Sequence, residues 1–160
     1  WSPACQAILE CIPEPTRWAL HELPELPRYH RDRALIVGDA AHALVPHQRA
    51  GAGQALEDAY VLASLLIDES CNRQNVPDVL AAFEQVRHAR TCKVQRTSHE
   101  AGNIYEYSGE GIGNDEAKLI ANLESRFEWL WNHDPHDDVI AAKKVISELG
   151  DSVKEEVLNV

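Results

Sequence analysis

Two short stretches of the chain contain the residues best suited to hold a ligand, and the first is Gly38-Asp39. This dipeptide follows the apolar run Ala34–Val37, which is typical of a buried strand. A strand that ends in Gly-Asp places a carboxylate at the carboxyl edge of a sheet, where open α/β sheets bind ligands. An ionised carboxylate only accepts hydrogen bonds, so a sugar-alcohol hydroxyl is a natural partner for Asp39. Taken alone, the dipeptide fits an aspartate that caps the following turn better than a ligand site.

The second stretch, Gly51-Ala52-Gly53-Gln54, begins a segment with the composition of a helix. The first N–H groups of a helix have no intrahelical partner and lie at the positive end of its dipole. They therefore attract anions, and glycines let the backbone come close to a planar ligand. Glycine-rich helix starts without any ligand are also common, so Gly-x-Gly alone is a weak signal.

Together these residues resemble the second flavin-binding segment of the FAD-dependent aromatic-ring monooxygenases, and most closely its salicylate hydroxylase-like group. The resemblance rests on Gly38-Asp39-Ala40-Ala41-His42, Pro46, Gly51, Gly53 and Glu57-Asp58-Ala59 at the family's spacing. It implies that Asp39 holds the ribityl chain of FAD, that the 51–54 helix start faces the pyrimidine edge of the isoalloxazine ring, and that Pro46 shapes the meeting place of flavin and substrate. The expected cofactor-binding residues are Gly38, Asp39, Pro46, Gly51, Ala52, Gly53 and Gln54.

The resemblance also implies a reaction. NAD(P)H would reduce the FAD, and O₂ would supply the oxygen atom placed on an electron-rich aromatic ring. The partners implied are a small aromatic substrate and O₂, while the substrate's identity, the choice of NADH or NADPH and the oligomeric state are not set by the sequence. The resemblance runs over about residues 1–131 but is sharp only over 34–67, and Trp129–Asp134 agrees with the group's tail.

Two motifs of the family are absent from the sequence, namely the N-terminal GxGxxG of the dinucleotide fold and the mid-chain Asp-Gly. The adenine and pyrophosphate sites are therefore expected elsewhere, and the chain is expected to be the C-terminal portion of a longer flavoenzyme. Its first residues contain no charged leader, so no signal peptide is expected.

Arg49 departs from the family pattern, which usually has a glycine at this position. If that glycine has a left-handed backbone, a side chain there costs roughly 1–2 kcal/mol. The arginine either is tolerated, and even favours an anionic flavin, or marks a weakened site. Arg49 and the missing glycine motif support the alternative function, a truncated non-catalytic product that acts at most as a helical interaction module.

Other polar clusters are interpreted as structural. His42 and His47 are five residues apart, but the spacing places no third ligand, so no metal site is expected. A helix cap explains the polar run 133–138 better than a metal site. The basic stretch Arg87–Arg96 has no interleaved aromatic residues and is predicted to be a solvated helix face.

Composition excludes several classes of protein. The 26 acidic and 15 basic residues give a net charge of −11, which argues against nucleic-acid binding. The longest apolar run, near Ala59–Ile67, is about half of a bilayer span, so no membrane segment is expected. The four cysteines form no CxxC pair, and we expect buried reduced thiols and a cytoplasmic location.

The predicted elements are helices over 4–11, 51–70 and 77–107, a helix capped by Asp115 and reaching Trp131, a helix from Pro135 stopped by Gly150, a frayed helix over the last ten residues, and strands over 18–23 and 34–37. A single buried strand cannot satisfy its own backbone, and we expect no sequence-local partner for it. The predicted fold class is α+β but mostly helical, the last strand and C-terminal helices of a Rossmann-type FAD-binding monooxygenase fold. The expected division is 1–28 (end of a substrate-domain segment), 29–70 (C-terminal part of the FAD-binding domain) and 71–160 (helical region).

Overall fold

A computed structural model describes residues 2–158, and the side chains of residues 2–150. Helices dominate the described chain, as predicted. The elements are α1 (Pro3–Glu10), β1 (His30–Arg31), β2 (Ala34–Leu35), α2 (Asp39–His42), the 3₁₀ turn η1 (Pro46–Gln48), α3 (Gly51–Leu66), α4 (Val76–Tyr105), α5 (Glu116–Ser125), α6 (Glu128–Trp131) and α7 (Pro135–Leu158).

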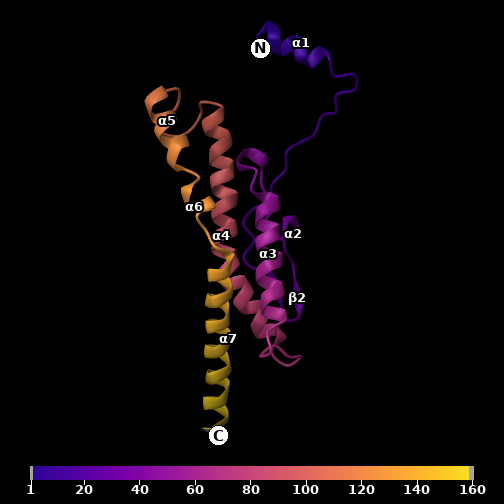
Figure 1. The fold of residues 1–160 in the computed structure, drawn as a ribbon, viewed down its shortest axis with the longest axis vertical. Helices are drawn as coiled ribbons and strands as arrows, with labels where there is room; N and C mark the ends of the chain where they lie inside the picture. Colours follow the sequence, from indigo (N-terminus) through magenta and orange to yellow (C-terminus); the bar gives the residue numbers. More distant parts are fainter. Residues whose placement is uncertain (1, 159–160) are drawn as a thin grey trace.

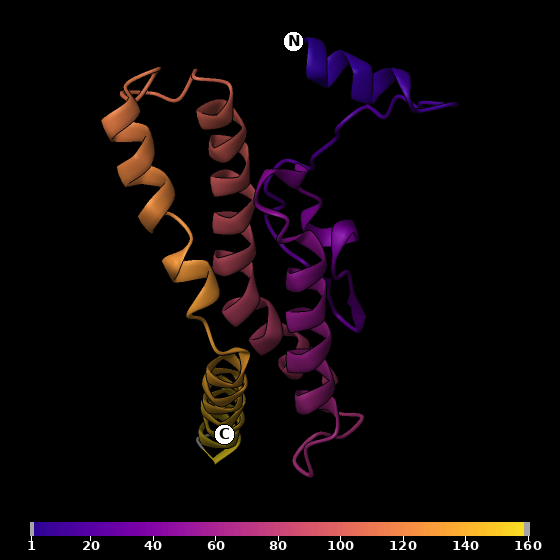
Figure 2. The ribbon, with the colours of Figure 1, turned by 45° about the horizontal axis from the view of Figure 1, so that its top comes forward.

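The core lies where the three long helices α3, α4 and α7 meet (Figure 1). Apolar residues at helical spacing bring one stripe of each helix into this contact. The buried members are Val61, Leu65, Val79, Ala82, Phe83, Val139 and Ala142. Figure 2 shows α5 and α6 on the side of α4 that faces away from α3, so α4 lies between them and α3.

The region before residue 29 differs from this body. Both views place α1 away from the helices, at the end of an extended segment (Figures 1 and 2). No residue of α1 is buried, and the Trp18 side chain is 83% exposed. The strand predicted over 18–23 is wrong. Prolines at 13, 15, 24 and 27 flank the segment, and among its described N–H groups only that of Leu23 has a backbone partner, the Ala43 carbonyl.

The strand at Ala34–Val37 is shorter than predicted and has a local partner. β2 pairs antiparallel with β1, in the register His30↔Leu35 and Arg31↔Ala34, so the expectation of no sequence-local partner is wrong. Asp32, with φ 54°, makes the tight turn between them. The side chains of Ile36 and Val37 are 38% and 39% exposed, so this apolar run is not buried against the described residues.

A carboxylate on α4 anchors the hairpin. Glu84 Oε2 accepts hydrogen bonds from the backbone N–H groups of Tyr29 and His30 and from His30 Nδ1. Burial raises the pKa of Glu84, but these three donors outweigh it and hold the pKa below its ordinary value. The Tyr29 ring is buried beneath, and its hydroxyl lies 2.7 Å from Thr91 Oγ1 on α4.

The C-terminal helices begin where predicted but end elsewhere. Asp115 caps α5 by accepting from the Lys118 N–H, and Asp134 precedes the first-turn Pro135 of α7. The single helix predicted from Asp115 to Trp131 is instead divided into α5 and α6. Helix α7 continues past Gly150 to Leu158, because an interior glycine weakens a helix by only about 1 kcal/mol and does not by itself end it. The last two residues of the predicted frayed end lie outside the described residues.

Two remaining predictions concern the cysteines and the membrane. All four cysteines are free thiols, but only Cys92 is buried and Cys11 is exposed, so the prediction of buried thiols holds for one of them. No helix in the described part of the chain is long and apolar enough to cross a bilayer.

Candidate functional site

The Gly38-Asp39 turn has a backbone that only glycine adopts readily. Gly38 has φ 58° and ψ −141°, and a Cβ there would lie 3.4 Å from Ala55 Cβ on α3. Asp39 is the first residue of α2, and its side chain is exposed. No described residue donates a hydrogen bond to its carboxylate. The turn therefore presents a carboxylate with free acceptor capacity.

The first turn of α3, which precedes the Ala55 that packs on Gly38, is also unsatisfied. No side chain caps this 16-residue helix, whose N-cap residue is Ala50. Ala52 and Gly53 are exposed, and a Cβ at Gly53 would meet no heavy atom within 4 Å. The N–H groups of residues 51–53 are therefore donors open to a ligand at the positive end of the helix.

Gln54, by contrast, is used inside the protein. Its side chain is buried, its Oε1 accepts from Arg87 Nη2 at 3.0 Å, and its Nε2 donates to Glu57 Oε1 at 3.0 Å. Its backbone N–H donates to the Ala50 carbonyl. The contacts of Gln54 thus fix the helix start rather than leaving a polar side chain free.

The turn that carries Pro46 is held against α4. Ser98 Oγ donates to the Val45 carbonyl at 2.6 Å, and Thr97 Oγ1 lies 3.2 Å from Gln48 Oε1. The His47 ring packs on Gly102, where a Cβ would come within 2.6 Å of it. Pro46 itself is exposed at the tip of this anchored turn.

Arg49 ends the same turn in the left-handed region, with φ 54° and ψ 30°. The left-handed backbone considered for this position is therefore confirmed. An arginine side chain there carries a strain of roughly 1–2 kcal/mol relative to glycine. Its side chain is exposed, next to the open start of α3.

Asp58 connects the Asp39 turn to the helices. Its Oδ2 accepts from the Gly38 N–H at 3.0 Å and from His42 Nε2 at 2.7 Å, and its Oδ1 accepts from Arg87 Nε at 2.9 Å. Burial raises the pKa of Asp58, but the hydrogen bonds from His42, Gly38 and Arg87 outweigh burial and keep the pKa below its ordinary value. The ionised carboxylate thus fixes the turn from which Asp39 projects.

The prediction that Arg87–Arg96 forms a solvated helix face is wrong for Arg87. Its side chain is 0% exposed, and it is the largest fully buried side chain in the described part of the chain. Arg87 lies four residues after Phe83 and seven before Val94, both fully buried, so helical spacing places it on the buried face of α4. Two features of the sequence therefore indicate that Arg87 is buried: this helical spacing, and the acidic pair Glu57-Asp58 inside an otherwise apolar helix.

Glu57 completes the buried cluster. It accepts from Arg87 Nη1 and from Arg90 Nε, both at 2.7 Å. Burial raises the pKa of Glu57, but the hydrogen bond and charge of Arg90 and the charge of Arg87 lower it below its ordinary value. Arg90 is therefore also not a solvated residue, whereas Arg96 is 56% exposed, and Lys93 lies 3.9 Å from the Trp129 ring centre.

The polar run at the start of α7 contributes to the same cluster. Asp134 Oδ1 accepts from the His136 N–H, which confirms the predicted helix cap. Asp138 Oδ2 accepts from His133 Nε2 at 3.0 Å and from Arg87 Nη1 at 3.1 Å. Glu57, His133 and Asp138 lie within metal-binding distance of one another, but the Arg87 guanidinium already bonds both carboxylates and supplies the positive charge there.

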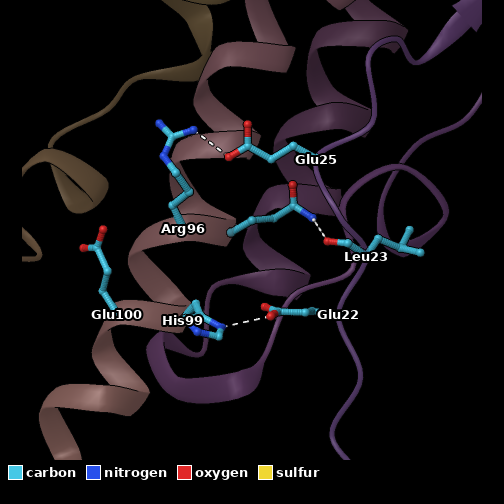
Figure 3. Close-up of a pocket in the computed structure, with 7 residues that line it drawn as sticks. Glu22, Leu23, Glu25, Arg96, His99 and Glu100 are labelled. Atoms are coloured by element: carbon cyan, nitrogen blue, oxygen red, sulfur yellow. Dashed lines mark hydrogen bonds and ion pairs between the residues drawn. The ribbon is translucent and has the colours of Figure 1, made fainter. Parts of the chain in front are cut away.

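The extended segment before the hairpin docks on the second half of α4 (Figure 3). Arg96 Nη1 lies 2.6 Å from Glu25 Oε1, and His99 Nδ1 lies 2.9 Å from Glu22 Oε1. Gln95 Nε2 donates to the carbonyls of Leu23 and Ala43, both at 3.1 Å. A pocket of about 290 Å³ opens between this segment and α4, and its polar side chains are mostly paired with one another.

Comparison with known proteins matches this arrangement to one family. The family described as FAD binding domain matches residues 13–98, more than half of the chain. Two salicylate hydroxylases of Pseudomonas putida are 51% and 52% identical over 143 residues, 89% of this chain and 33% of each relative. A solved salicylate hydroxylase substrate complex superimposes with a TM-score of 0.83 at 47% identity, over 87% of this chain and 34% of that one. The chain spans about a third of the length of these relatives. It belongs to the FAD binding domain family, in the salicylate hydroxylase-like group of FAD-binding monooxygenases.

Proposed function

We propose that this chain supplies the flavin-contacting edge of a FAD-dependent NAD(P)H monooxygenase that hydroxylates an aromatic ring with O₂. The observation that carries the proposal is the pairing of two unsatisfied groups, the free Asp39 carboxylate and the uncapped start of α3, on one frame held by Asp58. Both lie inside the region matched by the FAD binding domain family.

The donors and acceptors present suit FAD. Asp39 accepts hydrogen bonds, as the hydroxyls of the ribityl chain require. The free N–H groups of residues 51–53 suit the electron-rich pyrimidine edge of the isoalloxazine ring, and the open space at Gly53 lets the ring approach the backbone. When bound, FAD supplies the electron transfer from NAD(P)H and the reaction with O₂, while the protein binds and orients it.

The domain division belongs to the same proposal. Residues 29–70 provide the last strand, the Asp39 turn and the α3 contact of a Rossmann-type FAD-binding domain, residues 1–28 end a substrate-domain segment, and residues 71–160 support the site from behind. The adenine and pyrophosphate of FAD bind outside this sequence. A cytoplasmic location is in keeping with four free cysteine thiols.

A chimera tests the proposal. The matching third of a P. putida salicylate hydroxylase is replaced by this chain, and the flavin content of the purified protein is measured from its absorbance spectrum. We expect a yellow protein that oxidises NADH or NADPH in response to an aromatic substrate, and an Asp39→Ala chimera with reduced flavin content.

A non-catalytic interaction module is the second candidate function, and the strained Arg49 favours it. A folded, monodisperse chimera without bound flavin would support this second function and overturn the first. Circular dichroism and gel filtration establish that the chimera is folded before its flavin content is interpreted.

A further inference from the structure

The buried arginine at the centre of α4 makes contacts on three sides that suggest a role in the flavin site. We propose that Arg87 is a positioning residue, which aligns the Asp39 turn and the first turn of α3 with each other and with the start of α7. This inference rests on the proposed flavin function. Arg87 is fully buried, so it acts through other residues and does not touch the cofactor.

The guanidinium group reaches five acceptor atoms, as many as it has N–H donors. Arg87 Nε donates to Asp58 Oδ1 at 2.9 Å. Nη1 donates to Glu57 Oε2 at 2.7 Å and to Asp138 Oδ2 at 3.1 Å. Nη2 donates to Gln54 Oε1 at 3.0 Å and to the Gln54 carbonyl at 3.4 Å. A lysine has three donors on one nitrogen and cannot reproduce this planar arrangement.

Two of these contacts lead directly to the site. The Gln54 carbonyl belongs to the residue that follows Gly53, so Arg87 fixes the turn whose N–H groups are free. Asp58, held on its other oxygen by Arg87, accepts from the Gly38 N–H and thereby sets the direction of Asp39. One side chain therefore controls both halves of the site.

The charge of Arg87 has a second effect. Glu57 and Asp58 place two carboxylates within the first half of α3, where they oppose the positive potential of the helix start. Arg87 and Arg90 bond to these carboxylates and offset their charge. Removing the Arg87 contacts therefore weakens the attraction of the helix start for an electron-rich ring, in addition to loosening its geometry.

The test compares Arg87→Lys with two control variants. Arg96→Lys changes an exposed arginine on the same helix, and Val94→Ala removes core packing from α4 without touching the cluster. In the 160-residue chain, amide hydrogen exchange of Gly38 is measured by NMR. We expect exchange to accelerate at least about tenfold in Arg87→Lys beyond the acceleration explained by its global unfolding, and not in either control.

The same three substitutions are placed in the salicylate hydroxylase chimera, and FAD affinity and the midpoint potential of bound FAD are measured. We expect Arg87→Lys to weaken FAD binding at least about tenfold through lost geometry and to leave the potential near the parent value, because lysine keeps the charge, with Val94→Ala and Arg96→Lys near the parent in both. Equal effects of Arg87→Lys and Val94→Ala at matched loss of stability would overturn the positioning role. A parent chimera without flavin would overturn the proposed function instead, and Gly38 exchange would still decide whether Arg87 fixes the turn.

Discussion

Residues 2–28 and the body formed by α2, α3 and α4 differ in which side chains are buried and which are exposed. In the first region, large apolar side chains such as Trp18 are exposed and no residue is buried. In the body, Asp58 is buried and bonded to both Arg87 and His42, which are buried too. Burying ionised groups such as Asp58 and Arg87 is unfavourable unless they are paired, so this pair requires its geometry to be held closely. The pair lies directly behind the candidate flavin site.

The largest expected difference between the two regions is in the stability lost when a side chain of the buried cluster is removed. Asp58→Ala leaves Arg87 and His42 without their shared partner, and we expect a loss of about 3–5 kcal/mol in the free energy of unfolding. Trp18→Ala, in the other region, should change it by less than about 0.5 kcal/mol, because the ring is 83% exposed. Urea denaturation followed by circular dichroism measures both. A loss for Trp18→Ala comparable to that for Asp58→Ala would show that the two regions are not distinct.

A smaller change in free energy is expected for FAD binding when the Asp39 carboxylate is removed. Asp39→Ala in the flavin-binding chimera should weaken FAD binding by about 1.5–3 kcal/mol, the value of hydrogen bonds to a charged group. The free energy of unfolding without flavin should hardly change, because Asp39 is exposed. Flavin fluorescence titration gives the affinity, and Asp78→Ala, at the far end of the body, is the matched control. Normal flavin retention by Asp39→Ala would refute the role of this carboxylate.

The backbone strain at Arg49 is expected to be relieved by a glycine at this position. Arg49→Gly should raise the free energy of unfolding by about 1–2 kcal/mol, because φ is 54° at this residue. Arg96→Gly is the opposite control, since a glycine inside α4 should lower stability by about 1 kcal/mol. Flavin binding by the Arg49→Gly chimera should be preserved or improved. A marked loss of flavin would identify the arginine as a ligand.

The smallest effect is a dependence on pH. Asp58, Glu57 and Glu84 have pKa values below their ordinary values of 3.8 and 4.5, because their hydrogen-bond donors outweigh burial. Their stabilisation is complete above about pH 4.5 and is lost as the pH falls through the lowered pKa values. We expect unfolding free energy to be flat from pH 7 to about pH 5 and to decrease below. In Asp58→Asn the decrease should be shallower by at most about 1.4 kcal/mol per pH unit, measured by urea titrations across the range.

Sequence reasoning succeeded where the relevant information is local. The starts of α3, α5 and α7 follow from a glycine pattern, an aspartate cap and a first-turn proline, each within four residues of the helix it begins. The spacing of the residues from Gly38 to Asp58 resembles the family's second flavin-binding segment, and the family match covers this stretch.

It failed where contacts join distant segments. The alternation at Trp18–Leu23 resembles a strand, but no partner strand exists among the described residues and prolines flank it. The basic run on α4 was assigned to solvent because charge usually indicates exposure. Helical spacing alone places Arg87 on the buried face of α4. Its acidic partners, however, lie about thirty residues earlier on α3 and 51 residues later on α7, so only the packing of the three helices reveals what it bonds to.

Because Asp58 bonds to three partners, substitutions within this cluster are not independent of one another. A replacement at Asp58, His42 or Arg87 leaves the remaining members with a buried group that has lost its bond, so each single step is unfavourable even where a combined replacement would be sound. We therefore expect substitutions at these three positions to be tolerated only in combination. Exposed residues beside the site, such as Pro46 and Arg49, belong to no such shared cluster, so a single replacement there removes no buried bond.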